Sequence, residues 1–518
     1  MVNADNNAKR ENGIYYTPRE LALSLVEPFA EKAVPASILD PACGDGSLLR
    51  AAQEVFSRGR RGRRPHVYGC DVSPNLPQLR ELRPKRIWVK DFLELRLNRH
   101  FDLVLMNPPY VRHHGISLEA KQAYNLGVQT ICALPKISDL WAYFVVQAVE
   151  LVKDGGSVAA ILPWAFLQAD YARMLRRWLA ERFATIEVTA ISSQQFRDAE
   201  ERIALVWLKS KGRSCQSITL RNVTDPSHSE NTPKYNLSWS EWLRSRVVIT
   251  RAGPVDEILS LFSDKGFVPF REIADTRIGT VTGADSFFIV DRRFAEQIGL
   301  KEKDYHRIIR SLRDHRGLRL NGNCPDQVLM HFSSKPKIPQ VVQYLEKGRK
   351  EGVDQRAHCR RRSPWYAIPR PDPPDAFFPY RASHTPYLII NSPEYLCTNS
   401  VHAINWQKLT QKQIEWVQIS LLSAPGQLSL EAHGKTYGSG VLKIEPSALG
   451  NTIVTTGGGR LTKRIYKRID SLLNSNRRCE ASEIATDVVQ DVCGIDSETM
   501  QVCTSALCEL RRRRLSSP

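Results

Sequence analysis

The chain lacks the features that would place it in a membrane or a secretory route. No apolar run in its 518 residues reaches the ~18 residues of a membrane-spanning helix. The first residues, Met1–Asn7, show no basic stretch followed by an apolar one, so no secretory signal is predicted. The eleven cysteines form no C-x-x-C pair and no Cys/His cluster at zinc spacing. Because an odd number of cysteines cannot all pair, we expect reduced thiols and a cytoplasmic protein. Because no cluster has zinc spacing, we expect no metal site.

A complete dinucleotide-binding fingerprint is also missing. Residues 41–46 are predicted to form the loop between a short strand, Ala36–Asp40, and a helix that opens at Ser47. The spacing G-x-G-x-x-G would require a third glycine at the position of Leu49, which weakens an NAD-binding interpretation. Glycines at a helix N-terminus still allow the backbone to approach a ligand closely. The loop therefore remains a candidate ligand site.

Two further predicted strands end in carboxylates. His66–Cys70 is followed by Asp71, and Arg86–Lys90 is followed by Asp91 and Phe92. A carboxylate at the end of the second strand is placed to accept hydrogen bonds from ribose hydroxyls. After the third strand, the carboxylate suits the exocyclic amine of a base and the ring suits stacking on that base. Taken singly, such residues are more often surface carboxylates, but the series favours a nucleoside pocket.

The most informative stretch is the tetrapeptide Asn-Pro-Pro-Tyr, from Asn107 to Tyr110, after the apolar strand Phe101–Met106. Two prolines stiffen the turn, and the residue before a proline avoids helical backbone angles. The turn then presents two acceptors, the Asn107 side-chain oxygen and the Pro108 carbonyl, beside an aromatic ring. This arrangement suits a planar NH2 group, whose delocalised lone pair two acceptors can redirect toward an electrophile. The alternative is a proline-rich turn without chemistry.

In their letters and order these motifs resemble the gamma class of S-adenosylmethionine-dependent DNA adenine-N6 methyltransferases, the TaqI-like and Eco57I-like enzymes. The family's opening motif appears as Gly13–Pro18, its cofactor loop as Asp40–Gly46, and the tetrapeptide follows. The resemblance implies that the cofactor, S-adenosylmethionine, is bound by Thr17, Asp40, Pro41, Ala42, Cys43, Gly44, Asp71, Asp91, Phe92 and Pro109.

The resemblance also implies a mechanism. The target adenine is flipped out of double-stranded DNA, because its amine cannot reach the cofactor while it is stacked. Tyr110 and Phe196 would hold the flipped base between their rings, and Asn107 and Pro108 would accept from its N6 amine. No metal is implied. A single phenylalanine in a loop is often a hydrophobic plug, so the second interpretation of Phe196 stays open.

The charge of the chain favours a polyanionic partner. The formal net charge is +18 and the isoelectric point is about 9.5. Lysine and arginine contacts release the counterions that condense on DNA, so a basic protein suits this partner. Charge alone does not distinguish DNA from RNA or anionic lipid, and the arginine runs 60–64, 360–362 and 511–514 are of a kind often found in solvated loops or tails.

We expect an α/β fold, with a class I Rossmann-like methyltransferase sheet flanked by helices and a mixed α+β target-recognition domain after it. The predicted domains are a catalytic domain at 1–245, a recognition domain at 246–470, and a short helical extension with a basic tail at 471–518. The extension is either a small helical hairpin on the recognition domain or a frayed basic tail that contacts phosphate. Three segments resemble parts of the recognition domain of TaqI-like enzymes: Arg277–Val290, Ser363–Tyr366 and Tyr437–Lys443. Aromatic and glycine clusters of this kind are also common packing features.

Three other functions compete with DNA methylation as interpretations of these motifs. The tetrapeptide also serves methylation of RNA base amines and of protein glutamine, but those enzymes seldom need so large a C-terminal domain. A fused nuclease would need a carboxylate–lysine core, and none is evident in the sequence. Any restriction endonuclease partner is therefore expected to be a separate chain. A DNA-binding protein with a retired catalytic fold is disfavoured because the motifs look intact. One flipped base per event makes a monomer plausible.

Overall fold

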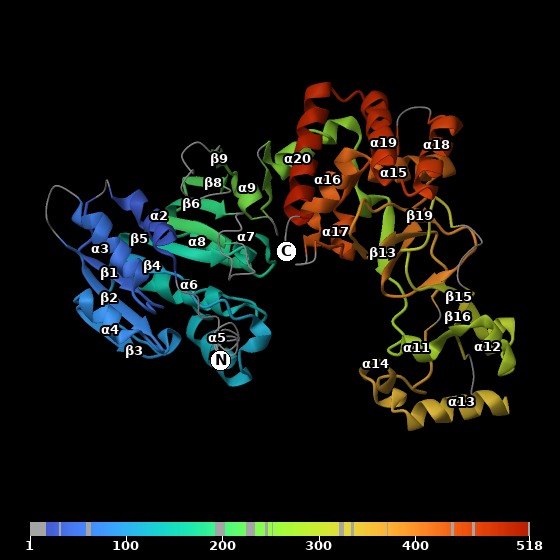
Figure 1. Ribbon diagram of the computed structural model, residues 1–518, viewed down its shortest axis with the longest axis horizontal. Helices are drawn as coiled ribbons and strands as arrows, with labels where there is room; N and C mark the ends of the chain where they lie inside the picture. The colour runs from blue at the N-terminus through green and yellow to red at the C-terminus, as the bar shows by residue number, and fades with distance from the viewer. Residues whose placement is uncertain are drawn as a thin grey trace. The chain divides into compact units, whose positions relative to one another are not determined.

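The computed structural model describes residues 17–30, 33–58, 64–191, 203–223, 234–243, 247–250, 252–320, 326–332, 336–369, 371–436, 440–457 and 461–515. The chain divides into two compact units, Met1–Pro254 and Val255–Pro518 (Figure 1). None of the helices in these ranges combines the length and apolarity that crossing a bilayer requires.

One sheet organises the first unit, with strand order β3-β2-β1-β4-β5-β7-β6-β8-β9. Neighbouring strands from β3 to β5 are parallel, and β7 runs antiparallel to both β5 and β6. The strands are β1 Ser37–Asp40, β2 His66–Asp71, β3 Arg86–Val89, β4 Phe101–Met106, β5 Val152–Pro163, β6 Phe183–Ile191, β7 Ile203–Lys211, β8 Ser217–Val223 and β9 Lys234–Asn236.

Helices cover both faces of this sheet (Figure 1). Because side chains alternate along a strand, Ile38 and Leu39 of β1 point to opposite faces and join two separate hydrophobic clusters. Helices α2 and α3 supply the cluster around Ile38, and α6 and α8 supply the cluster around Leu39. The helices are α2 Arg19–Val26, α3 Ser47–Ser57, α4 Leu76–Glu81, α5 Leu118–Val128, α6 Leu140–Glu150, α7 Ala165–Gln168, α8 Ala172–Ala180 and α9 Trp239–Trp242.

The sheet places the candidate residues at one edge. Strand β1 lies between β2 and β4, so the strand order reverses there, and ligands of open α/β sheets bind beyond the carboxyl ends of strands at such a point. The loop after β1 and the tetrapeptide after β4 both leave this edge. The α/β fold predicted from the sequence is confirmed.

The second unit distributes its strands over several small sheets, ordered β13-β21-β17-β19, β14-β16-β15-β20, β18-β23-β22 and β12-β24. These strands are β12 Val268–Pro269, β13 Ala274–Ile278, β14 Ile289–Asp291, β15 Tyr305–Ile309, β16 Gln327–Met330, β17 Ala376–Pro379, β18 Arg381–Ala382, β19 Ile389–Ile390, β20 Leu396–Cys397, β21 Val401–Trp406, β22 Lys435–Thr436, β23 Leu442–Lys443 and β24 Ile453–Val454. The helices are α10 Val255–Ser260, α11 Asp285–Phe288, α12 Arg292–Gln297, α13 Pro339–Lys350, α14 Ala357–Arg360, α15 Gln411–Leu422, α16 Ala424–His433, α17 Pro446–Gly450, α18 Lys463–Asn474, α19 Arg478–Cys493 and α20 Ser497–Leu515.

The C-terminal arginine run belongs to a packed helix, in contrast to the basic tail that the sequence suggested. Helix α20 lies against α16 and includes Arg511–Arg514. The Arg514 guanidinium forms an ion pair with Glu431 of α16 at 2.9 Å, and each of these side chains is 4% exposed. Arg514 also donates to the Ser383 and Gly440 carbonyl oxygens. The end of the helix is therefore held by buried charge.

Candidate functional site

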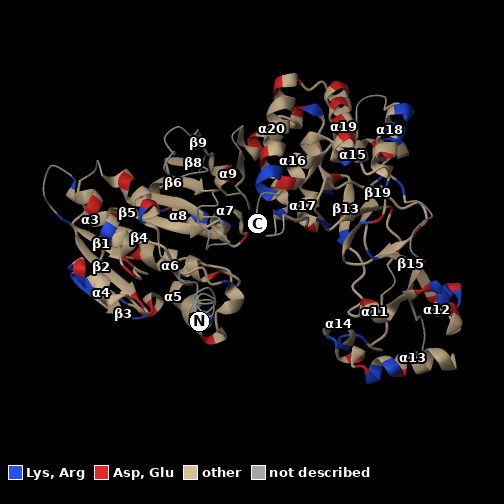
Figure 2. Cartoon of the chain, viewed as in Figure 1, with Lys and Arg blue, Asp and Glu red and all other residues tan. Residues whose placement is uncertain are grey.

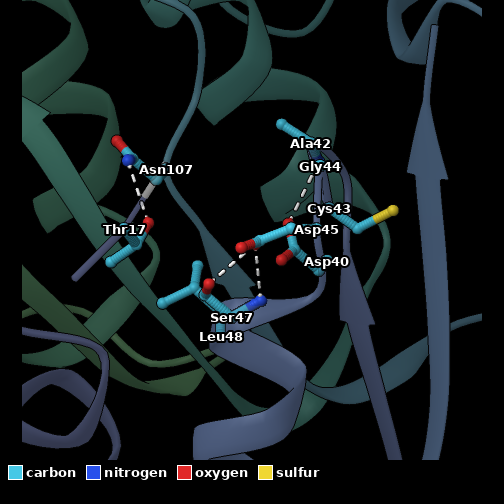
Figure 3. Close-up of a pocket in the computed structure, with 9 residues that line it drawn as sticks. All are labelled: Thr17, Asp40, Ala42, Cys43, Gly44, Asp45, Ser47, Leu48 and Asn107. Atoms are coloured by element: carbon cyan, nitrogen blue, oxygen red, sulfur yellow. Dashed lines mark hydrogen bonds between the residues drawn. The ribbon is translucent and has the colours of Figure 1, made fainter. Parts of the chain in front are cut away.

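A pocket lies at the sheet edge where β1 and β4 end. It joins the loop after β1 to the first residue of the tetrapeptide and to Thr17, just before α2 (Figure 3). Its lining residues are Thr17, Asp40, Ala42, Cys43, Gly44, Asp45, Ser47, Leu48 and Asn107. Segments far apart in sequence thus meet at one site.

The loop after β1 is held in a turn that admits little besides glycine at its end. Gly46 has φ +86°, and a Cβ atom there would lie 2.7 Å from the Leu79 side chain. Asp45 accepts hydrogen bonds from the backbone N–H and hydroxyl of Ser47 at 3.0 and 2.7 Å, which satisfies donors in the first turn of α3. The backbone of the loop can therefore lie close to a ligand at the start of a helix.

Asp40 is a buried carboxyl at the base of the pocket, only 1% exposed. Its Oδ1 accepts from the Ala42 N–H at 3.1 Å. Burial raises the pKa of the Asp40 carboxyl from 3.8 to about 8, with a smaller contribution from the negative charges of Asp71 and Asp45. Among the described residues no basic side chain pairs with it. A cationic ligand group beside Asp40 would stabilise the ionised carboxylate.

The carboxylates that end β2 and β3 are both held by backbone donors. Asp71 accepts from the Gly44 N–H at 2.9 Å, which ties β2 to the glycine loop, and from the Ser73 N–H at 2.8 Å. Asp91 accepts from the Leu93 N–H at 2.9 Å and from the Tyr124 hydroxyl at 2.7 Å. Each carboxylate is therefore fixed in orientation.

The ring of Phe92 departs from the expected stacking position. It is 1% exposed and packs against Phe144 with ring centroids 5.3 Å apart. The ring belongs to the hydrophobic core, so a planar ligand would reach it only after a rearrangement. Cys43 is also buried, and burial raises the pKa of its thiol far above the usual range, so the thiol stays neutral. Its small size fits beside Gly69, where a Cβ would lie 2.8 Å from the Cys43 sulfur.

The tetrapeptide presents its acceptors beside the loop. Asn107 Nδ2 donates to the Thr17 hydroxyl at 3.1 Å, which orients the amide (Figure 3). Within the described part of the chain, no donor reaches Asn107 Oδ1 or the carbonyl oxygen of the buried Pro108. The Tyr110 hydroxyl donates to the Ile161 carbonyl at 3.1 Å, which fixes the ring at the end of β5. One oriented amide and one anchored ring therefore belong to the same short turn.

Some candidates lie elsewhere. Phe196 and residues 13–16 of the opening motif are outside the described residues, and Pro41 and Pro109 flank the pocket in the chain without lining it. The sequence did not single out Tyr124, which contacts Asp91 from helix α5. Helix α5, which carries Tyr124, contains none of the motifs. Ser117 caps this helix by accepting from the Ala120 N–H, so a serine at this position is the local signal that could have located it.

Comparisons with known proteins agree on one family. Residues 71–196 match the model described as Eco57I restriction-modification methylase, and residues 252–490 match Type II methyltransferase M.Eco57I, C-terminal domain. The chain belongs to the Eco57I-like family of restriction-modification methylases. It is 20% identical over 475 residues to Type II methyltransferase M.AccI of Acinetobacter calcoaceticus, and 22% identical over 465 residues to M.XamI of Xanthomonas campestris pv. amaranthicola. Each alignment covers 84% of both chains.

A solved structure shows a similar fold. The Type IIL restriction-modification enzyme MmeI, determined in complex with DNA, is 12% identical and has a TM-score of 0.51. The match covers 98% of this chain and 76% of that chain. The cofactor of this methylase is S-adenosylmethionine. The pocket fits this cofactor, because its cationic methionine portion would pair with the buried Asp40 carboxyl, which has no basic partner among the described residues.

Proposed function

We propose that this methylase transfers a methyl group to the N6 amine of adenine in double-stranded DNA. The observation that carries the proposal is the orientation of Asn107, whose Nδ2 is bound by Thr17 so that Oδ1 is left to accept. Asn107 also lines the same pocket as the glycine loop. An acceptor for an amine and a site for the cofactor therefore adjoin.

The chain's own residues would act by positioning and polarisation. Asn107 Oδ1 and the Pro108 carbonyl accept the two hydrogens of the amine, which draws its lone pair out of conjugation. Tyr110, held by Ile161, stacks on the base, with Phe196 on its other face. S-adenosylmethionine supplies an activated methyl group on a good leaving group. The duplex must release the base first, at a cost of a few kcal/mol for unstacking.

The cofactor would be held by groups from three strand ends. Asp40 lies at the methionine end of the ligand, together with Thr17 and the backbone of residues 41–44. Asp71 accepts from the ribose hydroxyls, and Asp91 accepts from the adenine amine of the cofactor. We assign Phe92 and Pro109 to the walls around the cofactor's adenine, with Phe92 acting after its ring leaves the position against Phe144.

The two units would then divide the work. The first unit is proposed as the catalytic domain and the second as the domain that recognises a short DNA sequence. The named relatives M.AccI and M.XamI are Type II methyltransferases, which supports a role as the modification component of a restriction-modification system. The matching endonuclease is proposed to be a separate chain, and the methylase to act as a monomer.

Base-resolved methylation mapping of plasmid DNA tests this function. Purified protein and S-adenosylmethionine should place N6-methyladenine at one short recurring sequence. N4-methylcytosine in its place would overturn the assignment of the base. An unmarked plasmid, although the protein binds the cofactor, would refute DNA as the substrate and direct the same assay to RNA base amines and protein glutamine.

A further inference from the structure

Helices α13 and α14 carry a concentration of positive charge in the second unit (Figure 2). Residues 346–362 contain seven basic residues and three acidic ones. Six of the basic side chains are exposed and form what we call the α13–α14 basic surface: Lys347, Arg349, Lys350, Arg356, Arg360 and Arg361. The acidic neighbours are partly engaged, since Glu351 lies 3.8 Å from Lys347 and Asp354 accepts from Gln355.

The arginine run at residues 360–362 divides into two roles. Arg362 donates to the Thr282 carbonyl at 2.7 Å and to the Val281 carbonyl at 2.6 Å, so it holds the loop after β13. The guanidinium groups of Arg360 and Arg361 are exposed and form no hydrogen bond or ion pair with other described residues. One arginine therefore builds the surface, and the other two are available to a partner.

The loop that Arg362 holds lies directly on α14. Gly283 has φ +82°, and a Cβ atom there would lie 2.7 Å from the Cβ of His358. Thr282 is fully buried and its hydroxyl accepts from the Ala284 N–H at 3.0 Å. Val281, next to it, is 37% exposed beside the arginines. The surface thus combines free cations with an apolar side chain on a fixed loop.

Aromatic packing makes this surface rigid. The Phe287 ring stacks on Tyr344 of α13 with centroids 4.6 Å apart and lies 5.7 Å from Trp365. Gly348 allows the close approach, because a Cβ atom there would lie 2.4 Å from the Phe287 ring. The charged last turn of α13 and the short helix α14 are therefore held on a common base.

We propose that the α13–α14 basic surface binds the phosphate backbone of double-stranded DNA. Free guanidinium groups on a rigid base match phosphates, to which arginine donates in a bidentate manner. Contacts to phosphate position a protein on the duplex without reading its sequence. The inference rests on the proposed function and adds a location for the DNA contact, since neither the motifs nor the comparisons assign residues 346–362 a role.

The test measures binding of a labelled DNA duplex of arbitrary sequence to the full chain over a series of salt concentrations. In the variant R360Q/R361Q, the dissociation constant should rise about tenfold at low salt. The slope of log K against log salt should fall by about 2, since each lost phosphate contact removes about 0.9. Binding of S-adenosylmethionine and the melting temperature should not change.

Two control variants distinguish a phosphate contact at Arg360 and Arg361 from a loss of overall positive charge and from a loss of stability. K467Q/R468Q removes two exposed charges from α18 of the same unit and should leave the slope within about 0.5 of the wild-type slope. Arg362→Gln should lower the melting temperature, because it releases the loop at Val281 and Thr282.

Three outcomes would overturn the inference. The first is an unchanged slope in R360Q/R361Q while the wild-type protein methylates DNA. The second is an equal loss of slope in K467Q/R468Q. The third is preferential binding of a double-stranded RNA of the same sequence through Arg360 and Arg361. Absence of methylation by the wild-type protein would instead refute the proposed function, so the two failures are distinguishable.

Discussion

Each unit buries a carboxyl group, and the two units treat it differently. In the second unit, Arg514 and Glu431 are buried together as an ion pair that ties α20 to α16. In the first unit, Asp40 is buried without a cationic partner among the described residues. A buried charge is costly unless it is paired. The paired carboxylate therefore serves folding, whereas the unpaired carboxyl, which keeps its proton up to about pH 8, is where a cationic ligand group would favour ionisation.

The largest effect is expected when the paired charge is broken. Arg514→Met leaves Glu431 buried, with Arg511 at 3.6 Å as its remaining ion-pair partner among the described residues. Removing one partner of a buried pair costs about 3 kcal/mol, so the free energy of unfolding should fall by about that amount. Denaturant unfolding measures it. The affinity for S-adenosylmethionine at a temperature where the variant is folded should not change, and a loss of affinity would remove the contrast between the two units.

Replacing the unpaired Asp40 carboxyl should have the opposite pattern, a loss of cofactor affinity with little loss of stability. Asp40→Asn removes the carboxyl proposed to pair with the cationic part of the cofactor, so the dissociation constant for S-adenosylmethionine should rise about tenfold or more. Below about pH 8 the stability should change little, because the raised pKa keeps the Asp40 carboxyl protonated and a neutral amide then replaces a neutral acid. Above that pH the variant should be the more stable of the two. Calorimetric titration and thermal melting of the same samples check both. A variant that is destabilised but binds S-adenosylmethionine with intact affinity would contradict a ligand-binding role for Asp40.

The same carboxyl predicts a pH dependence. The folded protein holds a proton on Asp40 up to about pH 8, whereas the unfolded chain releases it near 3.8. The folded state therefore binds more protons in this window, so the contribution of Asp40 to stability falls as pH rises from about 4 to about 8. Cofactor affinity should rise over the upper part of the window as the carboxylate ionises. Titrations at several pH values should show this trend in the wild type and not in Asp40→Asn.

The smallest effect is expected at Tyr124. Tyr124→Phe removes the hydrogen bond to Asp91 and should weaken cofactor binding by about 1 kcal/mol, roughly fivefold. Discrimination between S-adenosylhomocysteine and its inosine analogue should also fall, because Asp91 would be less well oriented toward the amine. Tyr143→Phe is the matched control, since its hydroxyl donates to Asn125 and not to Asp91. Equal losses in both variants would show that helix packing, rather than Asp91, is the cause.

The sequence predicted the parts of the site that follow directly from strand ends. Apolar runs located β1, β2 and β4, and parallel strands bring their carboxyl ends to one edge, so the meeting of Asp40 and Asn107 could be expected. Contacts between distant residues could not be predicted this way. Tyr124 lies 33 residues from Asp91, and Arg362 lies 80 residues from Thr282.

Burial was the other property that the pattern did not reveal. Phe92 follows a strand-end carboxylate, as a stacking residue would, but its ring finds a partner in Phe144 and enters the core. Arg514 ends an arginine run typical of a solvated tail, yet it faces Glu431. In both cases the decisive partner lies on another helix, and local sequence carries no signal of it.

The most direct test of the central claim is methyl transfer by Asn107→Ala under single-turnover conditions, with cofactor affinity measured on the same preparation. Transfer to DNA should be lost while S-adenosylmethionine binds with nearly unchanged affinity, because Asn107 is assigned to the target amine and not to the cofactor. Near-normal transfer by Asn107→Ala would contradict the assignment of this residue to catalysis.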